Sequence, residues 1–94
     1  MSINYAYSTQ VKVVKCYPNP ATSIINFEFP SGVEKNSTIQ IYSFSGKKIT
    51  EVSANSSKIT VLLDDNNYYR GIYVFRLVDK NGKIVETGKF QVVR

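Results

Sequence analysis

The chain has 94 residues, which is enough for one compact domain with a single hydrophobic core. Hydrophobic residues make up 43% of the sequence and charged residues 20%, a balance that excludes a disordered chain. Val, Ile, Thr, Tyr and Phe are abundant, whereas Ala and Leu are scarce, so the composition favours strands and excludes a long helical bundle.

The net charge is +5, from 12 Lys and Arg against seven Asp and Glu spread along the chain. Scattered Lys residues on strands indicate solvated faces and protected sheet edges. The charge would also suit an anionic partner such as lipopolysaccharide, nucleic acid or an acidic polysaccharide, but it identifies none of them. No apolar run approaches the ~18–20 residues of a membrane helix. The first residues lack the features of a signal peptide, so we expect a fragment with an added start Met.

The residue inventory argues against catalysis. There is no His, and Cys16 is the single thiol, so neither an internal disulfide nor the usual zinc sites can form. A cysteine nucleophile would lack a histidine base, the acidic residues are scattered, and no Gly-rich phosphate loop is present. We therefore predict that the domain is not an enzyme and needs no metal or cofactor, with Cys16 acting as a small hydrophobic residue.

Residues 1–10 are polar and aperiodic, and we predict that they are the remnant of a linker before a domain over residues 11–94. Alternating apolar positions and turn-forming clusters predict seven strands in that domain. Their predicted ranges are 11–17, 23–29, 38–44, 47–53, 58–63, 71–79 and 83–93. Seven short strands without a helix predict an all-β fold, an immunoglobulin-like antiparallel β-sandwich.

The strongest turn signal is Asn81-Gly82, which predicts a hairpin with a two-residue type I′ turn. Such a loop pairs Leu77 with Glu86 and thereby places a carboxylate opposite an apolar residue on the expected core face. A bulge near Thr87-Gly88 would correct that mismatch.

Three further segments have turn chemistry. Tyr17-Pro18-Asn19-Pro20 contains two residues that precede proline, so the chain is expected to be extended and stiff and unable to continue a ladder. Ser45-Gly46-Lys47 predicts a second hairpin. The run 64–67, Asp-Asp-Asn-Asn, could supply oxygen ligands to Ca²⁺, although an Asx-rich turn is the favoured interpretation.

Four landmarks occur in a fixed order along the chain. They are Tyr17-Pro18-Asn19-Pro20, then 41–47 with Ser45-Gly46-Lys47, then 70–77 with Gly71-Ile72-Tyr73, and finally Gly82-Lys83 with the closing segment 88–93. In order and spacing they resemble the type A C-terminal sorting domain of the type IX secretion system over residues 14–94. The chain departs from the family pattern by lacking a Leu-Pro pair before Gly71, and by having Cys16 before the first landmark.

The resemblance implies a folded secretion signal at the C-terminus of a larger passenger protein. Such proteins are exported through the periplasm to the cell surface or medium of Gram-negative bacteria of the Bacteroidetes type. The implied partners are the outer-membrane type IX translocon and a surface sortase, which removes the domain and attaches the passenger to anionic lipopolysaccharide. Cleavage would fall in or before residues 1–13. We expect a monomer with no nucleic-acid partner.

The matching landmark positions are the candidate sorting-motif residues. They are Pro18, Asn19, Pro20, Gly46, Lys47, Gly71, Tyr73, Gly82, Lys83, Lys89, Phe90 and Val92. Each also has a structural interpretation, since prolines and glycines shape turns and Tyr73 suits a core. We place recognition in residues 83–94, where an edge strand could be bound by strand addition and Lys89 and Arg94 could pair with receptor acids.

Two other functions remain open from the sequence alone. A fibronectin-like or carbohydrate-binding β-sandwich module of a secreted enzyme would use the seven Tyr and the basic surface to bind polysaccharide. An oligonucleotide-binding barrel draws on the same residues, but such barrels usually have five strands instead of seven.

Overall fold

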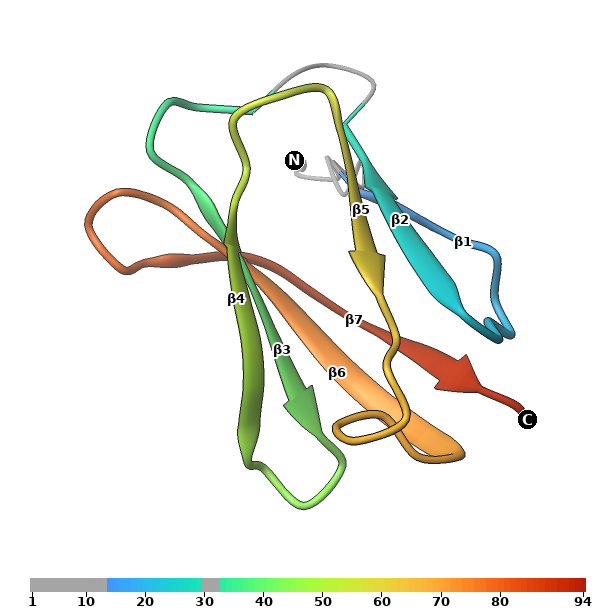
Figure 1. Ribbon diagram of the computed structural model, residues 1–94. Coiled ribbons are helices and arrows are strands. Elements are labelled where there is room, and N and C mark those ends of the chain that lie inside the picture. The colour runs from blue at the N-terminus through green and yellow to red at the C-terminus, as the bar shows by residue number, and fades with distance from the viewer. Residues whose placement is uncertain (1–13, 30–32) are drawn as a thin grey trace, which may run out of the picture.

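The computed structural model describes residues 14–29 and 33–94. These residues form seven strands and no helix, so none of them lies in a helix long and apolar enough to cross a membrane. The strands make two antiparallel sheets that face each other (Figure 1). They are β1 (Lys15–Tyr17), β2 (Ile24–Glu28), β3 (Thr38–Ser43), β4 (Lys48–Ser53), β5 (Lys58–Leu62), β6 (Gly71–Val78) and β7 (Ile84–Val92).

One sheet has the order β1-β2-β5 and the other the order β4-β3-β6-β7. The fourth strand therefore stays beside the third, and the chain crosses to the other sheet before β5. This arrangement confirms the predicted immunoglobulin-like sandwich of seven strands. The linker predicted over residues 1–10 lies outside the described residues, as do residues 11–13 of the first predicted strand.

The core follows the period-two pattern of the sequence. Ile25 and Phe27 of β2, with Phe29 just beyond it, are fully buried. On the facing sheet, Phe75 presents its ring to the Phe27 ring edge-on, with centroids 5.0 Å apart. Burying a Phe side chain stabilises the fold by about 1.5–3 kcal/mol, so these contacts hold the two sheets together. Between two of these core residues, Asn26 is also buried, and its Oδ1 accepts a hydrogen bond from a Thr60 hydroxyl at 2.6 Å.

The β6–β7 hairpin has the predicted register but not the predicted turn. Leu77 pairs with Glu86 as expected. The type I′ turn is wrong, because φ is positive at Gly82 (83°) and not at Asn81. The Gly82 N–H donates to the carbonyl of Asp79, and the Asp79 carboxylate accepts from the N–H groups of Asn81 and Lys83. These bonds fix a three-residue loop that begins one residue earlier.

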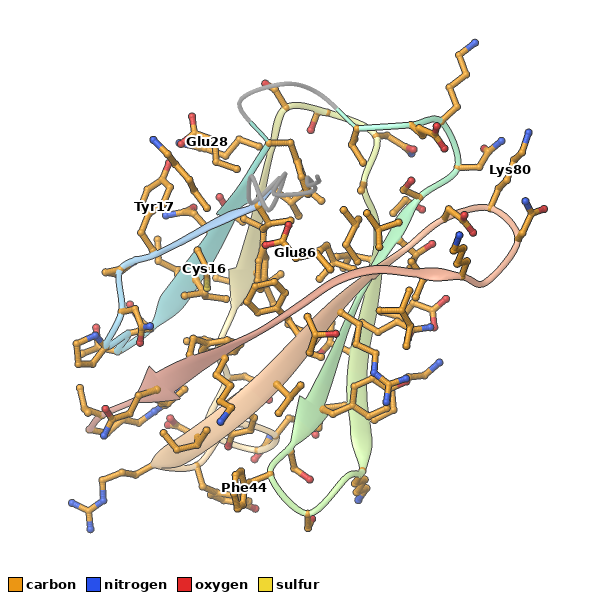
Figure 2. The ribbon with its side chains drawn as sticks, turned by 180° about the vertical axis from the view of Figure 1, so that it is seen from behind. Cys16, Tyr17, Glu28, Phe44, Lys80 and Glu86 are labelled. Carbon is orange, nitrogen blue, oxygen red and sulfur yellow. The ribbon has the colours of Figure 1, made fainter. Side chains whose placement is uncertain are left out.

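The bulge predicted near Thr87-Gly88 is also wrong. The register shifts next to Val78, which pairs with Ile84, so the extra residue is Val85, three positions after Gly82. The pairing of Leu77 with Glu86 therefore stands. The Glu86 carboxylate accepts a hydrogen bond from the Val14 N–H at 3.2 Å, which gives this acidic group a partner from the start of the first sheet. Figure 2 shows Glu86 on the side of the sandwich where β1 and β7 meet.

Candidate functional site

The C-terminal strand β7 carries the last group of landmark residues. Phe90 and Val92 are buried in the core, while Gln91 between them and Lys89 just before them are exposed. β7 is an edge strand, paired along its length only with β6 in the four-stranded sheet. It therefore combines an apolar face that fills the core with a charged face open to partners.

The first landmark covers the outer edge of β7. The Asn19 side-chain oxygen accepts a hydrogen bond from the Gln91 N–H at 2.9 Å. Two residues later, the Ala21 N–H donates to the Gln91 carbonyl at 2.7 Å, and the Ala21 carbonyl accepts from the Val93 N–H at 2.8 Å. Ala21 is fully buried and forms a parallel bridge with Val92. An isolated bridge thus joins the segment after β1 to the end of β7.

The two prolines of this landmark flank the contact. Pro18 and Pro20 are exposed, and the peptide bonds Tyr17-Pro18 and Asn19-Pro20 are both cis. Neither proline has an N–H to donate, so β1 ends at Tyr17 as the sequence predicts. Asn19 lies between the two prolines, and its side chain instead of its backbone accepts the hydrogen bond from β7.

The third landmark completes the group from the other side of β7. Gly71 begins β6 and pairs with Val92, while Tyr73 pairs with Phe90. The Tyr73 and Phe90 rings are stacked, with centroids 5.6 Å apart. Five landmark positions, contributed by three segments of the chain, therefore meet at the C-terminal end of β7. They are Asn19, Gly71, Tyr73, Phe90 and Val92.

The two Gly-Lys landmarks lie at the tips of hairpins at opposite ends of the sandwich. In Figure 2, Phe44 marks the β3–β4 hairpin and Lys80 the β6–β7 hairpin. Gly46 and Gly82 each have positive φ, at 100° and 83°, which only a residue without a side chain adopts without strain. Lys47 and Lys83 follow them and are exposed. The β3–β4 hairpin lies at the same end of the sandwich as the five landmark residues that meet on β7. The β6–β7 hairpin lies at the other end.

Several contacts of the site were not anticipated from the sequence. Arg94 donates to the Asp65 carboxylate and to the Leu63 carbonyl, so it binds within the chain instead of leaving its guanidinium for a receptor acid. Tyr68, next to the missing Leu-Pro pair, is buried and its hydroxyl hydrogen-bonds that of Thr50. A tyrosine three residues before Gly71 was the only signal for that contact.

The titratable groups of the site point away from nucleophilic chemistry. Cys16 is half-buried against the core, and desolvation raises the pKa of its thiol from 9.0 to about 12. At neutral pH the group is a thiol and not the reactive thiolate. In the 64–67 run, the Asn67 side chain donates to the Asp64 carboxylate and its N–H to the Asp64 carbonyl, so this Asx-rich run forms the expected turn.

Fold and site together define a small β-sandwich module in which landmarks from both ends of the chain are joined on one edge strand. Residues 15–92 match the family model of the secretion system C-terminal sorting domain. The chain therefore belongs to that family, as its landmarks had suggested, and it acts as a C-terminal sorting signal of type IX secretion.

A solved structure also resembles the whole domain. It is that of PorZ, described as an essential bacterial surface component of the type IX secretion system of Porphyromonas gingivalis. The identity is 16% and the TM-score is 0.73, with 95% of this chain and 12% of the PorZ chain covered. At this identity the likeness shows the fold, and the chain spans only a small part of that protein. The curated proteins include no significant match.

The family is one of secretion-signal domains, which are not catalytic. It implies interaction with the secretion system and secretion to the cell surface or extracellular space in Bacteroidetes.

Proposed function

We propose that residues 11–94 are the folded sorting signal of a longer protein and that residues 1–10 end the linker to its passenger. The outer-membrane type IX translocon recognises the signal after export to the periplasm of a Gram-negative cell. A surface sortase then cleaves within or before residues 1–13 and attaches the passenger to anionic lipopolysaccharide. The signal itself acts as a monomer, does not bind nucleic acid and leaves all chemistry to the passenger.

The observation that carries this proposal is the meeting of three landmarks at the end of β7. Asn19 hydrogen-bonds Gln91, and Gly71 pairs with Val92, so these landmarks depend on one another for their positions. A receptor that binds this region would recognise an arrangement of residues that exists only in the folded domain. The exposed Lys89 beside it offers a positive charge for an acidic receptor group.

The domain's need for β7 is tested with a secreted reporter. Fused to residues 1–94 and given an export signal in a host with type IX machinery, the reporter should reach the medium. The same reporter stopped at Asn81 should remain in the periplasm, because the truncation removes Phe90 and Val92 from the core. If the two fusions were secreted equally, the C-terminal strand would not be part of the signal.

A point variant separates recognition from folding. Lys89→Glu reverses an exposed charge on β7, whereas Lys58→Glu reverses an exposed charge at the start of β5 in the other sheet. We expect secretion to fall several-fold for Lys89→Glu and to stay unchanged for Lys58→Glu, with both domains folded by circular dichroism. Equal secretion of the two variants would move the receptor contact away from β7.

A further inference from the structure

A groove lies between the β3–β4 hairpin and the β5–β6 loop, which occupy the same end of the sandwich (Figure 1). We call it the tyrosine groove. Its volume is about 380 Å³, within the range of small-molecule sites. The residues that matter here are Ser43, Lys47 and Lys48 from the hairpin, and Asn66, Asn67 and Tyr69 from the loop.

Tyr69 presents an exposed ring on a fixed backbone. The residue is 68% exposed, although its neighbour Tyr68 is buried and hydrogen-bonded to Thr50. The Tyr69 carbonyl accepts a hydrogen bond from the Tyr73 hydroxyl at 2.8 Å. Because the backbone is held on both sides, the ring is presented to solvent at little further cost in conformational entropy. An exposed aromatic ring held in this way is a suitable stacking surface for a ligand.

The polar groups around the ring suit an anionic, hydroxyl-rich ligand. Lys48 is paired with Glu51 at 2.5 Å, whereas Lys47 makes no ion pair among the described residues. The Asn67 amide is oriented by its bond to Asp64, and the Asn66 amide forms no hydrogen bond within the described part of the chain. Among the described residues, none that lines this groove carries a carboxylate. It therefore combines an unneutralised ammonium with amides that can both donate and accept.

We propose that the tyrosine groove binds an acidic saccharide. The apolar face of one pyranose ring stacks on Tyr69, hydroxyl groups bond the Asn66 and Asn67 amides, and the sugar carboxylate pairs with Lys47. An acidic peptide would use the ammonium but would leave the ring face and the amides without suitable partners. This inference goes beyond secretion, because it concerns a ligand of the folded domain and does not depend on how the domain is recognised by the translocon.

The second hairpin supplies an internal comparison. A groove of about 480 Å³ lies beside it. Asp79 and Lys83 are equivalent to Ser43 and Lys47 of the first hairpin, because in each pair the N–H of the first residue donates to the carbonyl of the lysine. The described residues that line that groove include two carboxylates, those of Glu34 and Asp79, and no aromatic residue. Its lysine therefore has acidic neighbours and no stacking surface, so it should not bind the same ligand.

The test is a titration of the 94-residue chain, labelled with ¹⁵N, with trigalacturonic acid, followed by amide chemical shifts. We expect shifts in residues 43–49 and 66–69 and none in residues 33–37 and 79–85. A neutral galactose trisaccharide should bind at least several-fold more weakly. Tyr69→Ala and Lys47→Gln should each raise the dissociation constant roughly tenfold. Lys83→Gln, the matched control, should change it less than twofold. All three residues are exposed, so the variants should retain the folded spectrum.

Three outcomes would overturn the proposal. The first is no saturable shift with trigalacturonic acid, and the second is equal shifts at both hairpins, which would indicate general attraction to basic residues. The third is equally tight binding of a hexaglutamate peptide at the same residues, which would assign the groove to acidic peptides. None of these outcomes bears on secretion of the reporter, so failure here and failure of the sorting proposal are distinguishable.

Discussion

The four-stranded sheet has two edges, β7 and β4, that differ in how they are held. β7 buries Phe90 and Val92, and its outer side is hydrogen-bonded to the Ala21 backbone. β4 has no fully buried residue, and its Ile49 and Val52 are only partly covered by the core. The strand that belongs to the sorting landmarks is thus the better-anchored of the two edges.

The firmer anchoring of β7 means that the strand with the sorting landmarks depends on the folded domain. A free strand edge is a template for unwanted pairing, and proteins commonly cover or charge it. Here the edge near the C-terminus is covered by Ala21, while β4 carries the exposed pair Lys48–Glu51. We expect the end of β7 to open only when much of the domain unfolds, whereas β4 should tolerate change.

The largest effect should come from removing the Phe90 side chain. Phe90→Ala leaves a cavity beside Tyr73 and Phe27, and we expect it to lower the free energy of unfolding by about 3–5 kcal/mol. The corresponding change on the other edge, Val52→Ala, should cost about 1 kcal/mol because Val52 is only half-buried. Urea denaturation measures both. Equal losses would show that the two edges are anchored alike.

A smaller but more specific loss is expected for Gly88→Ala. A Cβ at this position would lie 2.4 Å from the Phe75 ring, which covers Gly88 directly across the β6–β7 ladder. Overpacking of this kind should lower the free energy of unfolding by about 1–3 kcal/mol. The neighbouring Thr87→Ala, on the exposed face, should have little effect.

A double variant tests the cause. If the Phe75 ring is the obstacle, Gly88→Ala should cost markedly less in a Phe75→Leu background than in the natural chain. A cost that is unchanged in that background would place the strain elsewhere on β7.

Features that depend on the local alternation of apolar residues were predicted correctly, whereas contacts between residues far apart in the sequence were not. Alternation in Ile25, Phe27 and Phe29 is local, and all three residues are buried as a period of two requires. All seven strands appear near their expected positions because this alternation is local. Leu77 also pairs with Glu86 as predicted, but only because the bulge after Ile84 offsets the extra residue of the loop.

The turn itself could not be read from Asn81-Gly82 alone. That dipeptide suits a two-residue loop, but the Asp79 carboxylate, two residues before it, accepts two N–H groups and shifts the turn. The bulge then falls after Ile84 and leaves Gly88 in the regular ladder, directly under Phe75. Competition between two nearby hydrogen-bonding patterns decided the outcome, and the dipeptide preference carried no information on it.

The candidate site was only partly predictable. Its members were identified one by one from the landmarks, but the bond between Asn19 and Gln91 joins residues 72 positions apart. Nothing in the sequence between them specifies that contact, which arises because the two sheets stack and bring β7 beside the β1–β2 connection. Tyr68 was missed because two adjacent tyrosines in a polar loop do not reveal which of them is buried.

Removing the hydrogen bond between Asn19 and the edge of β7 should lower the stability of the domain moderately. Asn19→Ala removes the acceptor for the Gln91 N–H and should cost about 1 kcal/mol of unfolding free energy. Hydrogen exchange of the Gln91 amide should become faster, because this donor then faces water. Asn55→Ala, at an exposed loop position next to β4, is the matched control and should leave both quantities unchanged. Unaltered exchange at Gln91 in Asn19→Ala would mean that the cover depends on Ala21 alone.

The smallest effect at neutral pH is expected at Cys16 of β1, the strand that precedes the cover of β7. Burial raises the pKa of this thiol from 9.0 to about 12, so the folded state holds the proton more tightly than the unfolded chain. The associated stability is fully present below about pH 9 and is lost as the pH rises towards 12. Tyr68, whose pKa burial also raises, contributes in the same direction in every variant. The difference in unfolding free energy between the natural chain and Cys16→Ala should therefore be constant from pH 6 to 8 and shrink above pH 9. A difference that stays constant up to pH 11 would show that the Cys16 thiol ionises as readily in the fold as in water.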